Sequence, residues 1–530
     1  MPPQSYKGPQ GPSSPVARPP RKIALIRHQD HAITVSATAT TGLPPEVLVG
    51  LTDHMTYKHV TMLYGAEAFA KCGKGRMVQS EERHLYEVGE TSRFLLTGAG
   101  YLPFVWNHLT QRGYEITYED LCGRPSHPQA YEVDWAHMYE RFTPRYRQEE
   151  CIAAITATDG GKINAIPGFG KSAVIGAICR GFRHARIAVV TKRSQVLTSL
   201  KRELLTYTAN VGQVGNGKNE KNRITLYSAD SLHHLDDLVD RTDFLFADEA
   251  HELAADRYAD RIGSLQVRKR FAFSGSFDAR PDKADARLEC LFGPEIFKLD
   301  FQEGVDHGLV VPIEVHWHNV ILDDHEVTAT GGSPTTKDRW DLWRNKGRNR
   351  IIAAIAHQSP DDEQVLILVK RVEHAMFLRK LLREFTVIHG DLSEEDEQFY
   401  RNNKMITDDW TPLDRKQRNR YQDQFRAGDL KKVISTAVWE VGVSFDALSV
   451  MIWGGAGSSE ISSTQGPGRT SRIHAASGKQ VGIVHDLLDQ FSPDRASQAA
   501  TRGRHYKKHK WVQRFPHDET PRRQIASARY

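Results

Sequence analysis

Residues 165–172 read A-I-P-G-F-G-K-S, and residues 248–251 read D-E-A-H. The first segment fits the Gly-rich pattern of a phosphate-binding loop, with Ala165 in the position of the first Gly. Its small residues let successive backbone N–H groups curl around an anion at the N-terminus of a helix. The second segment follows an apolar run at residues 243–247. Together, the two segments predict the two halves of a nucleotide-hydrolysis site in an α/β domain.

The polar residues of these segments have distinct predicted roles. Lys171 is expected to reach the β- and γ-phosphates, and the Ser172 hydroxyl is expected to take one Mg²⁺ position. The apolar strand delivers Asp248 and Glu249 at its carboxyl end, where open α/β sheets bind ligands. Asp248 is suited to hold Mg²⁺, directly or through water, and Glu249 to orient and deprotonate the attacking water. The predicted cofactors are ATP and Mg²⁺, with Ser172 and Asp248 as the metal-binding residues.

A segment upstream of the loop is predicted to hold the base. Gln148 lies at an expected helix start, where its amide can pair with adenine N6 and N7. Arg145 or Tyr146 is expected to lie against the base plane. The predicted cofactor-binding residues are Arg145, Gln148, Pro167, Gly168, Phe169, Gly170, Lys171, Ser172, Ala173 and Gly442. Ser274-Gly275-Ser276 is expected to bond to the two carboxylates and to couple the site to movement.

A second wall of the site is predicted much later in the chain. Residues 465–472 read Q-G-P-G-R-T-S-R, which has the form Q-x-x-G-R-x-x-R. Spacing of three would place Arg469 and Arg472 on one helical face. A guanidinium stays charged and takes phosphate oxygens bidentately, so Arg472 is the predicted arginine finger, with Arg469 beside it. The predicted catalytic residues are therefore Lys171, Asp248, Glu249, Gln465, Arg469 and Arg472.

The pattern of strand-like and helical runs predicts an α/β protein of several units. Alternating runs at 141–311 and again at 312–490 indicate two parallel sheets in tandem. The expected order is a disordered Pro-rich leader at 1–21, a small accessory α/β domain at 22–140, the two sheet domains, and a basic tail at 491–530. In the tail, Arg502, Arg504, Lys507, Lys508 and Lys510 either grip phosphates or form a solvated segment.

Composition excludes several classes of protein. The chain has 530 residues, 39% hydrophobic and 26% charged, and no apolar run approaches a membrane span. Five scattered cysteines without C-x-x-C spacing predict reduced thiols in a cytoplasmic compartment. A net charge of +5 is too small to predict nucleic-acid binding by itself. His233, His234 and His251 have no Cys or carboxylate at ligand spacing, so no metal beyond Mg²⁺ is expected.

The whole set of motifs resembles the superfamily 2 helicases, which have two RecA-like domains, over about residues 141–490. Residues 189–192, V-V-T-K, resemble the first DNA-contacting motif of that family. In the second domain, Ser435, Glu440, Gly442 and Val443 resemble the motif that bridges nucleotide and strand. The D-E-A-H letters alone do not make this a DEAH-box RNA helicase, because only about 40 residues follow position 490, and that group carries long C-terminal domains.

A narrower resemblance is to the phage recombination and repair helicases of the UvsW group. It is carried by residues 273–277, 291–298, 101–104 and 112–115. This resemblance implies an ATP-driven motor that acts on single-stranded, forked or branched DNA, with recombination or replication proteins as partners and no membrane association. The polar insertion near 391–414, the leader and the tail depart from the group, and they leave substrate choice and polarity open.

Two other functions remain open on the sequence. An RNA-unwinding enzyme would share the whole ATPase constellation, and only stimulation by RNA or DNA would separate the two. A clamp that binds ATP without hydrolysing it is opposed by Glu249 and the paired arginines. Absence of phosphate release would favour the clamp.

Overall fold

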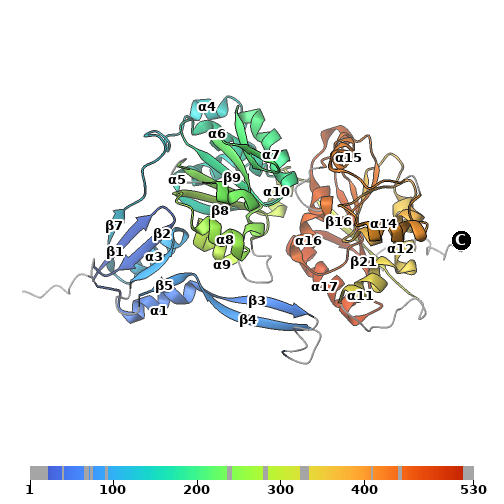
Figure 1. Cartoon of the computed structure of the whole chain (residues 1–530), viewed down its shortest axis with the longest axis horizontal. Coiled ribbons are helices and arrows are strands. Elements are labelled where there is room, and N and C mark those ends of the chain that lie inside the picture. Colours follow the sequence, from blue (N-terminus) through green and yellow to red (C-terminus); the bar gives the residue numbers. More distant parts are fainter. Residues whose placement is uncertain are drawn as a thin grey trace, which may run out of the picture.

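The structure is a computed structural model that describes residues 22–38, 41–64, 71, 76–89, 94–235, 241–277, 285–322, 334–407, 410–439 and 445–516. The predicted leader lies outside these residues, as do Glu440, Gly442 and Val443. A small N-terminal domain and two larger sheet domains follow one another along the long axis (Figure 1). No helix of the described part is both long and apolar enough to cross a membrane.

The N-terminal domain is a five-stranded sheet in the order β5-β6-β2-β1-β7. Its core packs apolar residues of the sheet against two helices, through Ile26, Ile33, Leu51 and Leu109. Strands β3 and β4 form a separate antiparallel hairpin that runs below the first sheet domain towards the second (Figure 1). The elements are β1 Lys22–Gln29, β2 Ala32–Ser36, α1 Pro45–His54, β3 Thr56–Tyr64, β4 Arg76–His84, β5 Tyr86–Val88, β6 Leu95–Gly98, α3 Leu102–Gln111 and β7 Tyr114–Asp120.

The first large domain is built on an eight-stranded sheet in the order β11-β10-β12-β9-β13-β14-β8-β15. All its pairings are parallel except β10 with β11. Its central strands are apolar and buried, as a parallel sheet covered by helices on both faces requires. The strands are β8 Gly160–Ala165, β9 Ile187–Thr191, β10 Val211–Gly215, β11 Lys218–Glu220, β12 Ile224–Ser228, β13 Phe244–Asp248, β14 Lys269–Ser274 and β15 Glu295–Leu299. The helices are α4 Trp135–Tyr139, α5 Gln148–Ala157, α6 Lys171–Gly181, α7 Ser194–Tyr207, α8 Asp256–Gly263, α9 Asp285–Phe292 and α10 Phe301–Asp306.

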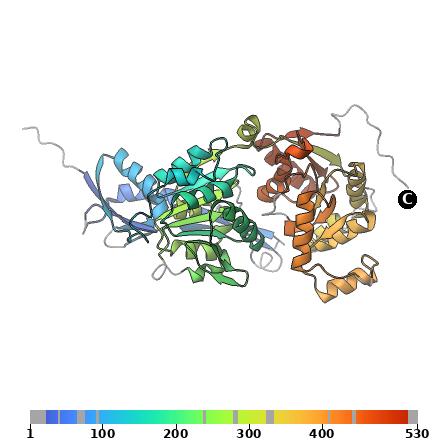
Figure 2. The same ribbon diagram turned by 90° about the horizontal axis from the view of Figure 1, so that it is seen from above.

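The second large domain has seven parallel strands in the order β18-β19-β17-β20-β21-β16-β22. Seen from above, it forms a body separate from the first sheet domain (Figure 2). Its strands are β16 Ile313–Asn319, β17 Val365–Leu368, β18 Thr386–Ile388, β19 Lys432–Ser435, β20 Val450–Trp453, β21 Gly482–Leu488 and β22 Val512–Arg514. Its helices are α11 Pro334–Asp338, α12 Lys346–Gln358, α13 Val372–Leu381, α14 Glu394–Asn402, α15 Arg415–Ala427, α16 Glu460–Gln465 and α17 Pro493–Lys508. The predicted fold class, two RecA-like parallel-sheet domains in tandem behind a small α/β domain, is confirmed.

The structure corrects the sequence analysis at the C-terminus. Residues 493–514, which were expected to belong to a basic tail, form helix α17 and strand β22, and β22 pairs with β16. Arg502 is fully buried because its guanidinium is paired with the buried carboxylate of Asp486 at 2.8 Å. Arg502 is therefore not free to grip phosphates.

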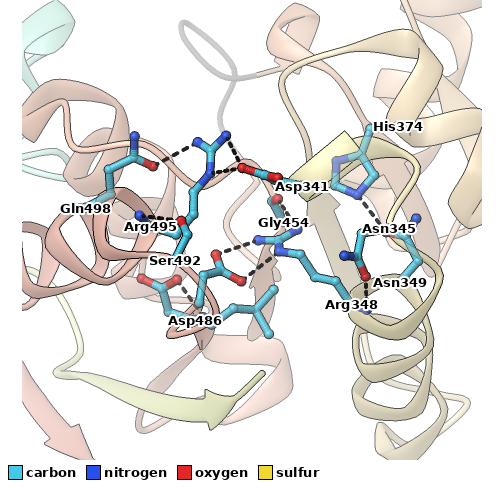
Figure 3. A network of polar contacts seen from close by, with 12 residues as sticks. Asp341, Asn345, Arg348, Asn349, His374, Gly454, Asp486, Ser492, Arg495 and Gln498 are labelled. Carbon is cyan, nitrogen blue, oxygen red and sulfur yellow. Dashed lines mark hydrogen bonds and ion pairs between the residues drawn. The ribbon is translucent and has the colours of Figure 1, made fainter. Parts of the chain in front are cut away.

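A buried polar network ties the second domain together (Figure 3). Arg348 of α12 donates to both carboxylate oxygens of Asp489, at 2.8 and 3.2 Å. It also donates to the carbonyl of Gly454, which follows β20, at 2.9 Å. Both charged side chains are almost completely excluded from solvent. The pair thus joins a helix, the end of β21 and the loop after β20.

Arg348→Ala should destabilise the second domain by about 3–5 kcal/mol, because it leaves the Asp489 carboxylate buried without its partner. Chemical denaturation followed by circular dichroism measures this loss. The matched control is Arg27→Ala, which breaks the half-exposed pair with Glu119 and should cost at most about 1 kcal/mol. Equal effects of the two substitutions would contradict the structural role assigned to Arg348.

Candidate functional site

A cleft of about 410 Å³ lies between the two sheet domains. The first domain contributes the phosphate loop, the end of β13, part of α7 and the start of α10. The second domain contributes the end of α16 and the segment after it, together with Arg426, Asp446, His509 and Trp511. The two sets of residues that the sequence analysis assigned to opposite walls of one site therefore face the same cleft.

The phosphate loop has the backbone that its sequence predicts. It leaves β8 at Ala165 and enters α6 at Lys171, and Gly168 and Gly170 adopt left-handed φ values of 93° and 86°. Glycine meets little steric cost in this region, whereas other residues are strained there. The Lys171 ammonium donates to the Ala165 carbonyl at 3.3 Å, so it lies over the loop. The N-terminus of α6 is thus presented to the cleft.

Gln148 is placed differently from its prediction. Its Nε2 donates to the Phe169 carbonyl at 2.6 Å, and its Oε1 accepts from the backbone N–H of Arg145 at 2.8 Å. The side chain is 1% exposed and does not line the cleft. The amide expected to read adenine is instead bonded to the phosphate loop and braces it in this structure.

The neighbours of Gln148 also differ in their access to the cleft. Arg145 lines it and donates to the Gly168 carbonyl at 2.8 Å. Tyr146 stacks on His307, with ring centroids 3.7 Å apart, and does not line the cleft. Of the other predicted cofactor-binding residues, the cleft is lined by Pro167, Gly168, Gly170, Lys171 and Ser172, but not by Phe169 or Ala173, and Gly442 lies outside the described residues.

The paired carboxylates stand at the end of β13. Asp248 ends that strand, and Glu249 follows it in a left-handed conformation with φ of 50°. Burial, reinforced by the adjacent Glu249, raises the pKa of Asp248 above its ordinary value. Burial works against the charge of Glu249 too, but the nearby side chains of Lys171, His251 and Arg469 outweigh this effect, so the pKa of Glu249 is lowered. Glu249 therefore stays ionised at neutral pH, as a proton acceptor must.

A polar chain connects the carboxylates to the second domain. His251 Nδ1 lies 3.5 Å from Glu249 Oε2 and 3.0 Å from Ser274 Oγ. The Gln465 amide nitrogen lies 3.4 Å from His251 Nε2 and donates to Ser276 Oγ at 3.2 Å. The Ser274-Gly275-Ser276 motif thus contacts His251 and Gln465, not the carboxylates as predicted. His251 is the residue that relays the contact, and only its place in the D-E-A-H run marks it in the sequence.

Arg469 and Arg472 both line the cleft, but they do not share a helical face. Helix α16 ends at Gln465, and a 3₁₀ turn follows over Pro467–Ser471. Arg472 comes after this turn in an extended conformation. Arg469 is 6% exposed and donates to the Trp439 carbonyl at 2.6 Å. Arg472 lies 3.5 Å from Asp446 and remains partly exposed.

Several cleft residues carry no sequence signal. Glu203 of α7 lines the cleft, and enclosure there raises its pKa despite the nearby Ser172 hydroxyl and the charge of Arg472. Phe301, Leu309, His509 and Trp511 supply an apolar and aromatic part of the lining. These residues belong to no motif and come together only through the tertiary fold. No group of three or more His, Cys, Asp or Glu side chains arranged to hold a metal occurs among the described residues.

Comparisons with known families match both sheet domains. The family model described as "Type III restriction enzyme, res subunit" matches residues 141–278. The model described as "Helicase conserved C-terminal domain" matches residues 347–474. No curated protein matches the sequence significantly. Both matched regions fall within the parallel-sheet domains that form the cleft.

Several solved structures resemble the chain at low sequence identity. T4 UvsW is 15% identical, with 93% of this chain and 99% of that one covered and a TM-score of 0.38. The Mycobacterium smegmatis helicase Lhr, bound to ssDNA and AMP-PNP, is 15% identical over 71% and 49% of the two chains, with a TM-score of 0.47. S. cerevisiae Dbp5, bound to RNA and ADP BeF3, is 14% identical over 73% and 94%, with a TM-score of 0.49.

Proposed function

We propose that this chain, a member of the superfamily 2 helicases by its two motor domains, is a DNA-dependent ATPase. It would use ATP hydrolysis to unwind or remodel branched DNA. The observation that carries the proposal is the interdomain cleft. Lys171, Asp248 and Glu249 line one wall, and Arg469 and Arg472 line the other. A site divided in this way lets nucleotide binding draw two domains together, which is how a motor couples hydrolysis to movement.

The residues of the first domain are proposed to bind and activate the nucleotide. The loop N–H groups and Lys171 would cradle the β- and γ-phosphates. The Ser172 hydroxyl and the Asp248 carboxylate are oxygen ligands that suit Mg²⁺, which would neutralise charge on the phosphates when bound. Glu249, held ionised by its cationic neighbours, would orient the attacking water and take its proton.

The residues of the second domain are proposed to complete the site on closure. Arg472 lies at the cleft beside Asp446 and would leave that carboxylate for the γ-phosphate. Arg469 is held by the Trp439 carbonyl and would support the same charge from a fixed position. Gln465, which contacts His251 and Ser276, would report the state of the first domain to the second.

Arg472→Ala should lower kcat by about 10³-fold or more while leaving much of the nucleotide affinity, because an arginine finger stabilises charge that develops in the transition state. Steady-state phosphate release and binding of a fluorescent ATP analogue measure the two quantities. Arg183→Ala, which removes an exposed arginine that pairs with Asp134 outside the cleft, is the control and should behave as wild type. Normal turnover by Arg472→Ala would contradict the finger assignment.

The substrate is tested by ATPase rates without nucleic acid and with single-stranded DNA, duplex DNA, forked DNA and single-stranded RNA, each at two salt concentrations. Strongest stimulation by forked DNA, falling as salt rises, would support remodelling of branched DNA in replication, recombination or repair. Stimulation by RNA alone would make the protein an RNA helicase. Nucleotide binding with no turnover under any condition would make it an ATP-switched clamp.

A further inference from the structure

Helix α17 and strand β22, residues 493–514, form a C-terminal hook that lies beyond the region matched by the second family model. The hook grips the segment that leads to Gln465. Arg502 donates to the carbonyl of Gly457, before α16, at 2.8 Å. Lys508 pairs with Glu460, the first residue of α16, at 2.7 Å. The helix that positions Gln465 in the cleft is thus held from outside by the hook.

The hook is itself firmly anchored in the second domain. Arg502 and Asp486 form a buried two-contact ion pair at 2.8 and 3.0 Å. Tyr506 donates to the same carboxylate at 2.8 Å and is fully buried. Because buried charges are held in place by paired hydrogen bonds, the hook should move as one body with β21. A displacement of the end of the hook should therefore move the second domain as a whole.

The end of the hook reaches the first domain. Trp511 is 6% exposed and stacks on Tyr506, with centroids 5.2 Å apart. Its ring also meets Phe301, the first residue of α10, in an edge-to-face contact at 5.8 Å. Both Phe301 and Trp511 line the cleft. Both residues belong to one apolar core cluster that includes residues of the two sheet domains.

We propose that the C-terminal hook couples the nucleotide cleft to domain closure, with Trp511 as a positioning residue that pivots on Phe301 while the hook holds α16 in place. The inference rests on the proposed function, because closure requires a nucleotide in the cleft. An edge-to-face aromatic contact suits a pivot, since offset and T-shaped ring arrangements are both favourable over a range of separations. The hook is thus part of the motor, although no motif of the motor includes it.

The test compares Trp511→Ala, Trp511→Phe and the control Trp135→Ala, which removes a half-exposed tryptophan of α4 outside the cleft. Small-angle X-ray scattering with and without AMP-PNP measures closure, and a fluorescent ATP analogue measures affinity. Trp511→Ala should bind the analogue within about threefold of the wild-type affinity, but it should not compact when the analogue binds. Its ATP turnover should be at least about tenfold slower, because the equilibrium between open and closed domains is shifted about tenfold towards the open form. Trp511→Phe, which keeps an aromatic ring beside Phe301, should compact on nucleotide binding and recover most of the turnover that Trp511→Ala loses. Trp135→Ala should compact and hydrolyse as wild type.

Compaction and turnover of Trp511→Ala at the wild-type level would overturn the inference, as would an equal loss in Trp135→Ala. If Trp511→Ala melts below the assay temperature, Phe301→Leu probes the same contact from the first domain and should show the same loss of compaction. Wild-type protein that binds AMP-PNP without compacting would overturn the inference and leave the proposed nucleotide site intact. Wild-type protein that binds no nucleotide would overturn the proposed function and the inference with it.

Discussion

Glu249→Gln is expected to bind ATP with nearly wild-type affinity and to hydrolyse it about 10²- to 10⁴-fold more slowly, the range that one general base contributes. The substitution keeps the size and hydrogen-bonding reach of the side chain but removes its basicity. Glu249 is suited to the role because it lines the cleft and because Lys171, His251 and Arg469 keep its pKa low. Single-turnover hydrolysis and analogue binding, measured on one preparation, separate chemistry from affinity.

The control for this prediction is Glu119→Gln, on strand β7 of the N-terminal domain, whose carboxylate pairs with Arg27 and lies outside the cleft. It should hydrolyse ATP at the wild-type rate. If Glu249→Gln also turned over normally, water activation would have to be assigned elsewhere in the cleft. Glu203, the remaining glutamate of the cleft lining, would be the next residue to substitute.

The motifs predicted the fold and both walls of the cleft because each has a strong local cause. The apolar run before Asp248 fixes a buried strand, and parallel strands place their carboxyl ends at one edge. The glycines of the phosphate loop supply the left-handed backbone that the turn into α6 needs. Such features depend on short stretches of chain, so the sequence alone reveals them.

The parts that the sequence could not predict depend on contacts between distant segments. The side-chain amide of Gln148 can hydrogen-bond to adenine or to the backbone. Only the folded loop shows that it donates to the Phe169 carbonyl. The spacing of Arg469 and Arg472 predicted one helical face, but α16 ends before them. The sequence Gly466-Pro467-Gly468 leads from α16 into a 3₁₀ turn. The basic C-terminus looked like a tail because the partners of its buried arginines lie in other segments of the chain. Arg495 pairs with Asp341, and Arg502 pairs with Asp486 of β21.

The same dependence on tertiary contacts explains how the two walls communicate. His251 touches Glu249 and Ser274 in its own domain and Gln465 in the other. A shift of one domain against the other must therefore alter a contact that ends on the proposed base. In the proposed motor, His251 would therefore link movement of the second domain to the residue that activates water.

Lys171→Ala is expected to abolish ATP use, and its effect should exceed the loss of one contact. A charged hydrogen bond to phosphate contributes about 1.5–3 kcal/mol, so nucleotide affinity alone should fall by roughly 10- to 150-fold. Lys171 is also the strongest of the charges that lower the pKa of Glu249, so its removal raises that pKa and weakens the ionised base.

Hydrolysis by Lys171→Ala should therefore stay at background even at ATP concentrations that saturate the weakened site, whereas a purely binding role would allow recovery. Titration of phosphate release against ATP over a wide range distinguishes these outcomes. The control is Lys298→Ala, which removes an exposed lysine of β15 and should leave the titration unchanged. Full recovery of kcat by Lys171→Ala at high ATP would restrict Lys171 to ground-state binding, because an interaction lost equally from the ground state and the transition state changes only KM.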